Sequence, residues 1–315
     1  MQEPRSASVL FAKLFGRLPD RGAEDTSRLR SRVADFLADD QSGEDVRVQY
    51  DNDPDRRDHR IADAGGFPES DANGIVEGTL RLSEAEAQRL LTAQASTNGW
   101  LTYHAVSADH TGTGRVRLIG AAGVSVVSDI DDTIKITEIP AGPRVIAINT
   151  FYREFAPTTE LRARYKALGD AAFHYVSGGP WQMYRPVSTF LIGGRHFPEG
   201  TFHMRTLSNA VFAEPITTID GLSKFVVADG TFEHKVERIT ELMRRFPERR
   251  FVLIGDSGEQ DPEIYRRVQS LSRAQVQEIV IRDVTNARVL QPDRLEGMTV
   301  VEAPTVVRGV SQFPR

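Results

Sequence analysis

The stretch VSVVSDIDDT, residues 124–133, decides how the C-terminal half of this sequence folds. Its first five residues predict a short buried strand, and the next five place three carboxylates within four positions. Carboxylates this close repel one another unless a cation or a proton intervenes. Mg²⁺, which prefers oxygen ligands, would neutralise them, whereas an acidic turn on the surface would leave them to water. The motif alone favours neither a metal site nor a surface turn.

Two further polar clusters also begin where a predicted strand ends. SGGPW (177–181) follows the apolar run FHYV, and GDSGEQD (255–261) follows FVLI. Short apolar strands that alternate with amphipathic helices are typical of a parallel α/β sheet. The carboxyl ends of such strands meet at one crevice, where ligands bind. We therefore expect the three clusters to form a single site at one edge of the sheet.

Hydrophobic spacing predicts the remaining elements of the chain. Helical spacing is found at 8–18, 26–39, 84–95, 158–168, 235–246 and 262–273. Alternating or apolar runs predict further strands at 46–50, 75–82, 100–106, 115–120 and 278–284. The interpretation is an N-terminal helical segment (1–45), a small antiparallel β domain with a sandwich-like arrangement (46–120), and an α/β domain (121–315).

The composition excludes several kinds of function. The chain has 315 residues, a net charge of −5 and no cysteine, so disulfides and thiolate metal sites are ruled out. Its basic residues are interspersed with acidic ones, which argues against nucleic-acid binding. No apolar run approaches the ~20 residues of a membrane span. Lys13 and Arg17 also interrupt the apolar residues of the N-terminal stretch, so we expect no secretory signal and a cytoplasmic protein.

In order along the chain, these clusters resemble the four motifs of the haloacid dehalogenase superfamily. The residues that carry the resemblance are Asp129, Asp131, Thr133, Ser177, Lys235, Gly255, Asp256 and Asp261. The strings SDIDDTI, YVSGGPWQMY, EHK and VLIGDSGEQDPEIY are similar to one family within it, the actin-patch type of phosphatidate phosphatase and its bacterial relatives. The resemblance covers about residues 124–285 and implies a Rossmann-like parallel sheet. One departure is SGGPW, where the family has a serine-rich SSSPW.

The resemblance implies that phosphomonoesters are hydrolysed through an aspartyl-phosphate. Asp129 would be the nucleophile that attacks phosphorus. Asp131 would protonate the leaving oxygen and then accept a proton from the hydrolytic water. Thr133 would fix the turn that carries both carboxylates.

The resemblance also assigns the groups that bind phosphate and metal. The phosphoryl oxygens would be held by Ser177, Gly178 and Lys235. Mg²⁺ would be held by Asp129, the carbonyl of Asp131 and Asp256, with Asp261 in support. Asp132 and Glu259 are interpreted as exposed charges rather than ligands.

By the same resemblance the substrate is phosphatidate, which lies in a membrane surface. Residues 8–18 would form a basic amphipathic helix that makes a peripheral membrane contact, or the same apolar stripe would pack against the protein's own core. Two other functions stay open: hydrolysis of a soluble metabolite or phosphoprotein, and an interaction protein whose α/β domain is catalytically silent. The intact set of Asp129, Asp131, Lys235 and Asp256 argues against the silent alternative.

Overall fold

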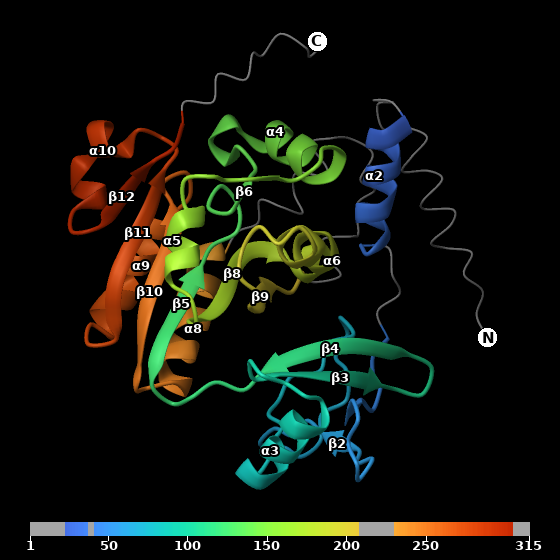
Figure 1. Cartoon of the computed structure of the whole chain (residues 1–315). Helices are drawn as coiled ribbons and strands as arrows, with labels where there is room; N and C mark the ends of the chain where they lie inside the picture. The colour runs from blue at the N-terminus through green and yellow to red at the C-terminus, as the bar shows by residue number, and fades with distance from the viewer. Residues whose placement is uncertain (1–22, 37–40, 208–229, 305–315) are drawn as a thin grey trace. The chain divides into compact units, whose positions relative to one another are not determined.

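The computed structural model describes residues 23–36, 41–207 and 230–304 (Figure 1). The chain divides into two compact units. One contains residues 33–121, and the other contains residues 122–205, most of helix α2 (Ala23–Ala34) and the C-terminal part of the chain. The helix predicted at 8–18 lies outside the described residues. None of the described helices is long and apolar enough to cross a membrane.

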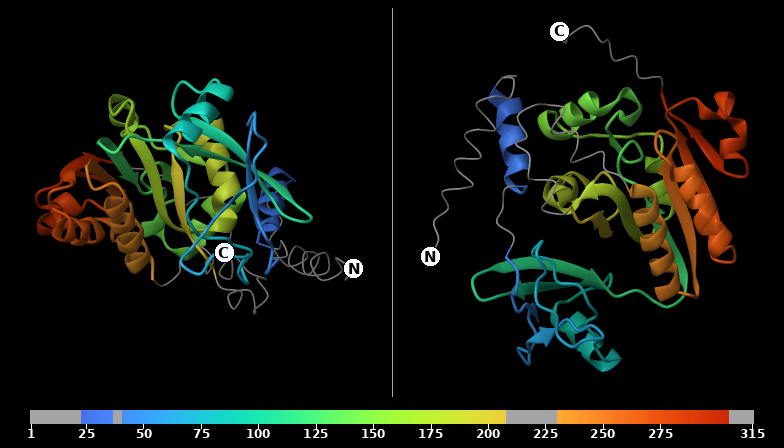
Figure 2. Two further views of the ribbon diagram at one scale, coloured as in Figure 1. Left: turned by 90° about the horizontal axis from the view of Figure 1, so that it is seen from below. Right: turned by 180° about the vertical axis from the view of Figure 1, so that it is seen from behind.

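The second unit is an α/β domain built on a six-stranded parallel sheet (Figures 1 and 2). Its strands are β5 (Gly123–Ser128), β8 (Ala172–Pro180), β9 (Thr201–Arg205), β10 (Arg249–Asp256), β11 (Val276–Asp283) and β12 (Thr299–Glu302). Their order is β12-β11-β10-β5-β8-β9, and every neighbouring pair is parallel. The predicted fold class is thereby confirmed.

The strand order fixes where a ligand can bind. From β5 the chain adds β8 and β9 on one side, then returns to add β10, β11 and β12 on the other side. In an open parallel sheet, a crevice forms at the carboxyl ends of the strands where this direction changes. Here the change falls between β5 and β10, which are direct neighbours.

Besides most of α2, the described helices of this domain include α5 (Arg162–Ala167), α6 (Tyr184–Ser188), α8 (Thr231–Arg245), α9 (Asp261–Leu271) and α10 (Ala287–Leu290). As its spacing predicts, α8 buries Ile239, Leu242 and Met243 in the main core. It begins at Thr231, one turn earlier than predicted. Lys235 therefore lies inside the helix, where its side chain can be buried.

The segment between β5 and β8 contains elements that periodicity does not predict. Short strands β6 (Lys135–Ile136) and β7 (Ala156–Pro157) pair with each other, and helix α4 (Pro143–Ala147) continues as a π-helical turn over Ile148–Tyr152. Every residue from 146 to 152 is buried. A helix that is buried all round has no polar face, so it leaves no amphipathic pattern in the sequence.

Between residues 41 and 121, the first unit consists of one antiparallel sheet and one helix. Its strands are β1 (Arg47–Tyr50), β2 (His59–Arg60), β3 (Trp100–Val106) and β4 (Thr111–Arg117), in the order β2-β1-β3-β4. Helix α3 (Glu84–Ala93) begins with a capping box formed by Ser83 and Glu86, and it packs Leu90 into the core of this sheet. A sandwich-like arrangement needs a second sheet, and the described residues of this unit form none.

The strand predicted at 75–82 is wrong. Within it only Thr79 pairs, in a single bridge with Ala62. Leu80 and Leu82 pack against the same core as α3, so their alternation reflects burial of an irregular segment. Alternating burial produces a strand only where a neighbouring strand supplies backbone hydrogen bonds.

The turn that follows β5 is organised around Asp132. This residue is buried, not exposed as predicted, and it has a left-handed φ of 53°. Its Oδ1 accepts hydrogen bonds from the backbone N–H groups of Thr137 and Glu138, both at 2.8 Å. Its Oδ2 accepts a third from Ile139 at 2.6 Å, and its carbonyl accepts one from Arg282 at 2.8 Å.

Thr133, which is expected to fix this turn, does not do so through its side chain. Its hydroxyl is buried and makes no hydrogen bond within the described part of the chain. Its carbonyl accepts a hydrogen bond from the hydroxyl of Thr158 at 2.8 Å. Asp132 holds the turn instead, because three backbone donors converge on one carboxylate.

Replacing Asp132 should therefore cost much stability. Asp132→Ala leaves three backbone N–H groups without their acceptor, and we expect the free energy of unfolding to fall by about 3 kcal/mol or more. Asp132→Asn keeps one acceptor oxygen and tolerates the left-handed backbone, so its loss should be smaller. Urea unfolding of the two variants measures this difference. Equal stabilities for the alanine and asparagine variants would contradict the proposed role.

Candidate active site

The carboxyl ends of β5 and β10 bring three aspartates together. Asp129 follows the last residue of β5, Asp256 ends β10, and Asp261 begins α9. The backbone N–H of Asp129 donates to the carbonyl of Ile254 at 2.9 Å, which fixes the two strand ends to each other. Each aspartate offers one oxygen such that all three oxygens lie within 4.8 Å of one another. All three side chains are buried.

Lys235 is the cation of this cluster. Its Nζ donates to Asp129 Oδ1 at 2.8 Å and to Asp261 Oδ1 at 2.7 Å, and it lies 3.3 Å from Glu259 Oε2. Burial alone would lower the pKa of Lys235, but Asp129, Asp261 and Glu259 raise it well above its ordinary value. The lysine is therefore charged, and its position inside α8 is what buries it beside the strand ends.

The cluster still holds more negative charge than Lys235 can neutralise. Burial, opposed by Lys235, raises the pKa of Asp129 well above its ordinary value. Burial, together with the neighbouring Asp261 and Asp129, raises the pKa of Asp256 in the same direction. A second cation would relieve this repulsion.

Two carboxylate oxygens are available to such a cation. Asp129 Oδ2 and Asp256 Oδ2 are buried, and neither has a hydrogen-bond partner among the described residues. The other oxygen of Asp256 accepts from the N–H of Gly258 at 2.6 Å. A buried oxygen without a donor is costly unless a metal ion completes it. The donor set is all oxygen, which fits a hard divalent cation.

Asp261 supports this arrangement without a free oxygen of its own. Its Oδ1 accepts from Lys235, and its Oδ2 accepts from the backbone N–H of Asp256 at 3.2 Å. Gly255 makes this approach possible, because a Cβ at that position would lie 2.3 Å from Asp261 Oδ2. Glycine at position 255 is thus a steric requirement of the cluster.

Asp131 belongs to a separate group of polar residues. Its Oδ1 accepts from Lys135 Nζ at 2.5 Å and from the Thr137 hydroxyl at 2.6 Å. Burial opposes ionisation, but Lys135 outweighs it, so the pKa of Asp131 lies below its ordinary value. Sequence reasoning missed Lys135, although it follows Asp131 by four residues and sits in an apolar context. Lys135 is only 2% exposed, and a buried lysine needs such a partner.

A pocket of about 210 Å³ opens beside these residues. Its polar lining is Asp131, Thr137, Thr231 and Glu259 together with the backbone of Gly178 and Gly179. Its apolar wall is formed by Ile139, Pro143 and Ile146. Glu259, predicted to be an exposed charge, is partly buried and joins the pocket to the carboxylate cluster, because it also contacts Lys235.

The carboxyl end of β8 meets the start of α8 at the edge of this pocket. The buried hydroxyl of Ser177 accepts from the backbone N–H of Gly179 at 3.0 Å. A Cβ at Gly178 would lie 2.7 Å from the Thr231 methyl and 3.0 Å from its hydroxyl oxygen. The side chain of Thr231 therefore occupies the space that a side chain at position 178 would need.

The structure thus brings most of the predicted site residues together. Asp129, Lys235, Asp256 and Asp261 form one buried cluster, and Asp131 and Gly178 line the adjoining pocket. Residues that sequence reasoning did not assign to the site are Lys135, Thr137, Thr231 and Glu259. Of these four residues, only Glu259 lies inside one of the three polar clusters of the sequence, GDSGEQD (255–261).

Comparison with known proteins agrees with this geometry. A Saccharomyces cerevisiae protein named phosphatidate phosphatase APP1 is 29% identical over 170 residues, which cover 52% of this chain and 27% of the yeast protein. A Schizosaccharomyces pombe protein described as uncharacterized is 27% identical over 173 residues, covering 54% of this chain and 26% of its own length. The chain thus spans about a quarter of the length of these curated relatives.

A family match covers the same region as the α/β domain. The family described as "Phosphatidate phosphatase APP1, catalytic domain" matches residues 124–283, just over half of the chain. The match begins in β5 and ends with β11, so it includes the carboxyl ends of β5, β8 and β10, which carry the site. The chain therefore belongs to the family of phosphatidate phosphatase APP1 catalytic domains.

Proposed function

We propose that this chain is a magnesium-dependent phosphatase of the haloacid dehalogenase type, with Asp129 as its covalent nucleophile. The observation that carries the proposal is the buried pair of Asp129 and Lys235 beside the oxygens of Asp256. One oxygen of Asp129 is held by Lys235, while the other has no donor within the described residues. A carboxylate that is held on one side and free on the other is positioned to attack.

In the first step one oxygen of the Asp129 carboxylate attacks phosphorus. A bond forms between that oxygen and phosphorus, the ester P–O bond breaks, and the leaving oxygen takes a proton from Asp131. In the second step water attacks the aspartyl-phosphate and gives its proton to Asp131, which releases inorganic phosphate and restores Asp129. Asp131 lines the pocket and is therefore within reach of a leaving group.

The protonation of Asp131 must change during this cycle. In the free protein Lys135 and Thr137 hold its carboxylate, and its pKa lies below the ordinary value. Its resting form is therefore the base that the second step needs. A phosphate ester entering the pocket brings negative charge close to Asp131, which raises its pKa and favours the acid that the first step needs.

Mg²⁺ would be held by Asp129, Asp256 and the carbonyl of Asp131, with Asp261 in support. Its charge would shield the anionic nucleophile from the anionic phosphate. The remaining phosphoryl oxygens would be held by Ser177, the N–H of Gly178 and Lys235. The hydroxyl of Thr231 lies close to the position that a side chain at 178 would take. Thr231 would therefore supply a hydroxyl near the place where a chain with SSSPW has a serine hydroxyl.

Asp129→Asn should abolish turnover and leave the fold intact. Asparagine keeps the shape but is a poor nucleophile, so we expect kcat to fall on the order of 10³-fold or more. The thermal midpoint should not fall, because the substitution removes a buried carboxylate that repels Asp256 and Asp261. Phosphate release from p-nitrophenyl phosphate measures activity, and Asp170→Asn, an exposed aspartate, is the matched control. Near-normal turnover by folded Asp129→Asn would refute the mechanism.

Activity should require a divalent cation that binds at Asp256. Mg²⁺ at about 100 times its Kd should stabilise the wild-type protein by about 2.7 kcal/mol, and Asp256→Asn should lose this gain. Without metal, Asp256→Asn should be at least as stable as wild type, because burial and Asp261 raise the pKa of Asp256. Thermal unfolding with Mg²⁺ and with EDTA tests both points independently of activity. Full activity in excess EDTA would show that no metal is needed.

We also propose phosphatidate or a related lipid phosphate as the substrate. Besides its polar residues, the pocket is lined by the apolar side chains of Ile139, Pro143 and Ile146. Trp181 and Tyr184 follow the carboxyl end of β8, are 36% and 43% exposed, and have ring centroids 6.1 Å apart. Exposed tryptophan and tyrosine are favoured at the interface between lipid and water.

If this aromatic pair contacts lipid, removing it should lower activity on membranes selectively. The double variant Trp181→Ala with Tyr184→Ala should hydrolyse phosphatidate in vesicles about tenfold more slowly, relative to its rate on p-nitrophenyl phosphate. Leu290→Ala removes an exposed apolar side chain on α10 and should leave this ratio unchanged. Wild-type protein that hydrolyses soluble esters but not phosphatidate would favour a soluble substrate instead.

A further inference from the structure

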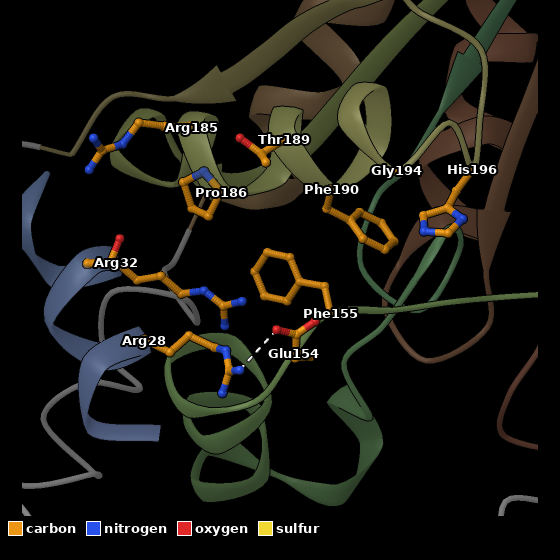
Figure 3. Close-up of a pocket in the computed structure, with 11 residues that line it drawn as sticks. Arg28, Arg32, Glu154, Phe155, Arg185, Pro186, Thr189, Phe190, Gly194 and His196 are labelled. Atoms are coloured by element: carbon orange, nitrogen blue, oxygen red, sulfur yellow. Dashed lines mark hydrogen bonds and ion pairs between the residues drawn. The ribbon is translucent and has the colours of Figure 1, made fainter. Parts of the chain in front are cut away.

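The α/β unit includes two segments outside the family match, most of α2 and the chain after β11. On α2, Arg28 and Arg32 donate to backbone carbonyls within residues 150–153. They line a pocket of about 540 Å³ that shares no lining residue with the pocket beside Asp131 (Figure 3). The chain after β11, in contrast, reaches the carboxylate cluster itself through Arg294.

The 3₁₀ helix η6 (Pro292–Leu295) brings Arg294 to the loop that follows β10. Arg294 Nη1 donates to the carbonyl of Ser257 at 2.6 Å, and its Nη2 donates to the carbonyl of Glu259. The same guanidinium binds the carboxylate of Glu263 on α9, with Nε at 2.6 Å and Nη2 at 3.0 Å. The planar group therefore holds the loop between β10 and α9 at two points.

Helix η6 is itself fixed to the domain. Leu295 is buried in the main core of the α/β unit. On α9, Arg266 Nη2 donates to the carbonyls of Asp293 and Arg294, both at 3.2 Å. These contacts hold the backbone that carries the Arg294 side chain, so the guanidinium has a defined position against the loop.

The peptide bond between Ser257 and Gly258 connects Arg294 to Asp256. This bond is trans, so the carbonyl of Ser257 and the N–H of Gly258 point in opposite directions. Arg294 holds the carbonyl, and the N–H donates to Asp256 Oδ1 at 2.6 Å. A charged donor on the carbonyl also polarises the N–H and strengthens its hydrogen bond. Asp256 Oδ2, which has no donor in the described part of the chain, stays available to a cation.

Other contacts fix Ser257 but do not set the direction of its carbonyl as closely. Its N–H donates to the carbonyl of Arg282 at 3.0 Å, and its hydroxyl donates to Asp283 Oδ1 at 2.8 Å. The hydroxyl of Thr285 lies 3.5 Å from the Ser257 carbonyl, whereas Arg294 lies 2.6 Å from it. Hydrogen bonds weaken with length, so Arg294 is the stronger determinant of this peptide's orientation.

We propose that Arg294 is a positioning residue of the metal site. By holding the carbonyls of Ser257 and Glu259, it directs the N–H of Gly258 onto one oxygen of Asp256 and leaves the other oxygen for a divalent cation. The inference rests on the proposed function, because it assumes that Mg²⁺ binds at Asp256. Groups behind a metal ligand set its orientation and thereby the affinity for the metal, although they do not touch it.

The charge of Arg294 and its positioning role predict opposite effects of its removal. Hydrogen bonds to Glu263, against burial, raise the pKa of Arg294 above its ordinary value, and the charges of Asp256 and Asp261 add to this effect. The guanidinium is therefore charged, and it acts on the carboxylates of the site. Since like charges repel, its charge alone predicts that Mg²⁺ binds more tightly once the arginine is removed. A positioning role predicts weaker binding.

Calorimetric titration of the full chain with Mg²⁺ distinguishes these effects. Arg294→Met removes the donors but keeps an apolar stem, and Arg294→Lys keeps the charge without the planar fork. Arg288→Met is the matched control, because Arg288 is an exposed arginine of the same segment that pairs with Glu302 at 3.2 Å. Thermal unfolding in EDTA establishes that each variant is folded at the temperature of the titration.

We expect the Kd for Mg²⁺ to rise about tenfold or more in Arg294→Met and to stay unchanged in Arg288→Met. Arg294→Lys should lie between wild type and Arg294→Met, and it decides the question if the methionine variant does not fold. With p-nitrophenyl phosphate, the Mg²⁺ concentration for half-maximal activity should rise by the same factor, while kcat at saturating Mg²⁺ approaches the wild-type value.

Two different results would count against these proposals. A Kd equal to or tighter than that of wild type in the folded Arg294 variants would overturn the positioning role alone, because the wild-type protein would still bind Mg²⁺. Wild-type protein that does not bind Mg²⁺ would refute the proposed metal site, and the role of Arg294 with it.

Discussion

The buried ammonium group of Lys235 is the point on which the carboxylate cluster depends. It donates to Asp129 and Asp261 and contacts Glu259, so it links a strand end, a helix start and the pocket wall. Buried carboxylates are tolerated only when a cation balances them and donors satisfy their oxygens. The lysine reaches this position because α8 begins at Thr231 and carries Lys235 to its second turn.

Hydrogen bonds of a backbone carbonyl and of buried hydroxyl groups stabilise the strand ends that carry the site. The Ile254 carbonyl accepts from the N–H of Asp129 and from the hydroxyl of Tyr265, both at 2.9 Å. The hydroxyls of Ser128 and Tyr165 lie 2.6 Å apart at the end of β5. These contacts join neighbouring strands to the helices that pack on them, so the carboxylates sit on rigid elements. Rigid support of this kind keeps like charges close without allowing them to move apart.

The sequence was sufficient to predict the parallel sheet and the meeting of its strand ends. Buried strands such as 124–128 and 251–254 are mostly apolar, and polar residues follow them at once, so their type is visible in the sequence. The second of them extends two residues further at each end than its apolar run. The segment from 135 to 157 escaped prediction because its short strands, α4 and its π-helical turn carry no regular period. The alternation at 75–82 led to a wrong prediction for the opposite reason. The segment has the period of a strand, but only Thr79 pairs with another segment, in a single bridge to Ala62.

Individual roles were harder to predict than positions. Asp129, Asp256 and Asp261 could be placed together because each follows a strand or begins a helix at the same edge of the sheet. The role of Asp132 could not, because an aspartate that binds three backbone N–H groups looks in the sequence like any acidic turn residue. The pairing of Lys135 with Asp131 likewise depends on a tight turn that only the folded chain defines.

The contact between Gly178 and Thr231 links two positions that are distant in the sequence. A Cβ at 178 would come within 2.7 Å of the Thr231 methyl, so the two residues share one volume. A chain with serine at position 178 needs a residue smaller than threonine at position 231. A chain with glycine at position 178 can carry a hydroxyl at position 231 instead. Across homologous chains, these two positions should therefore covary, and the end of β8 and the start of α8 should be exchanged as a pair when the pocket is redesigned.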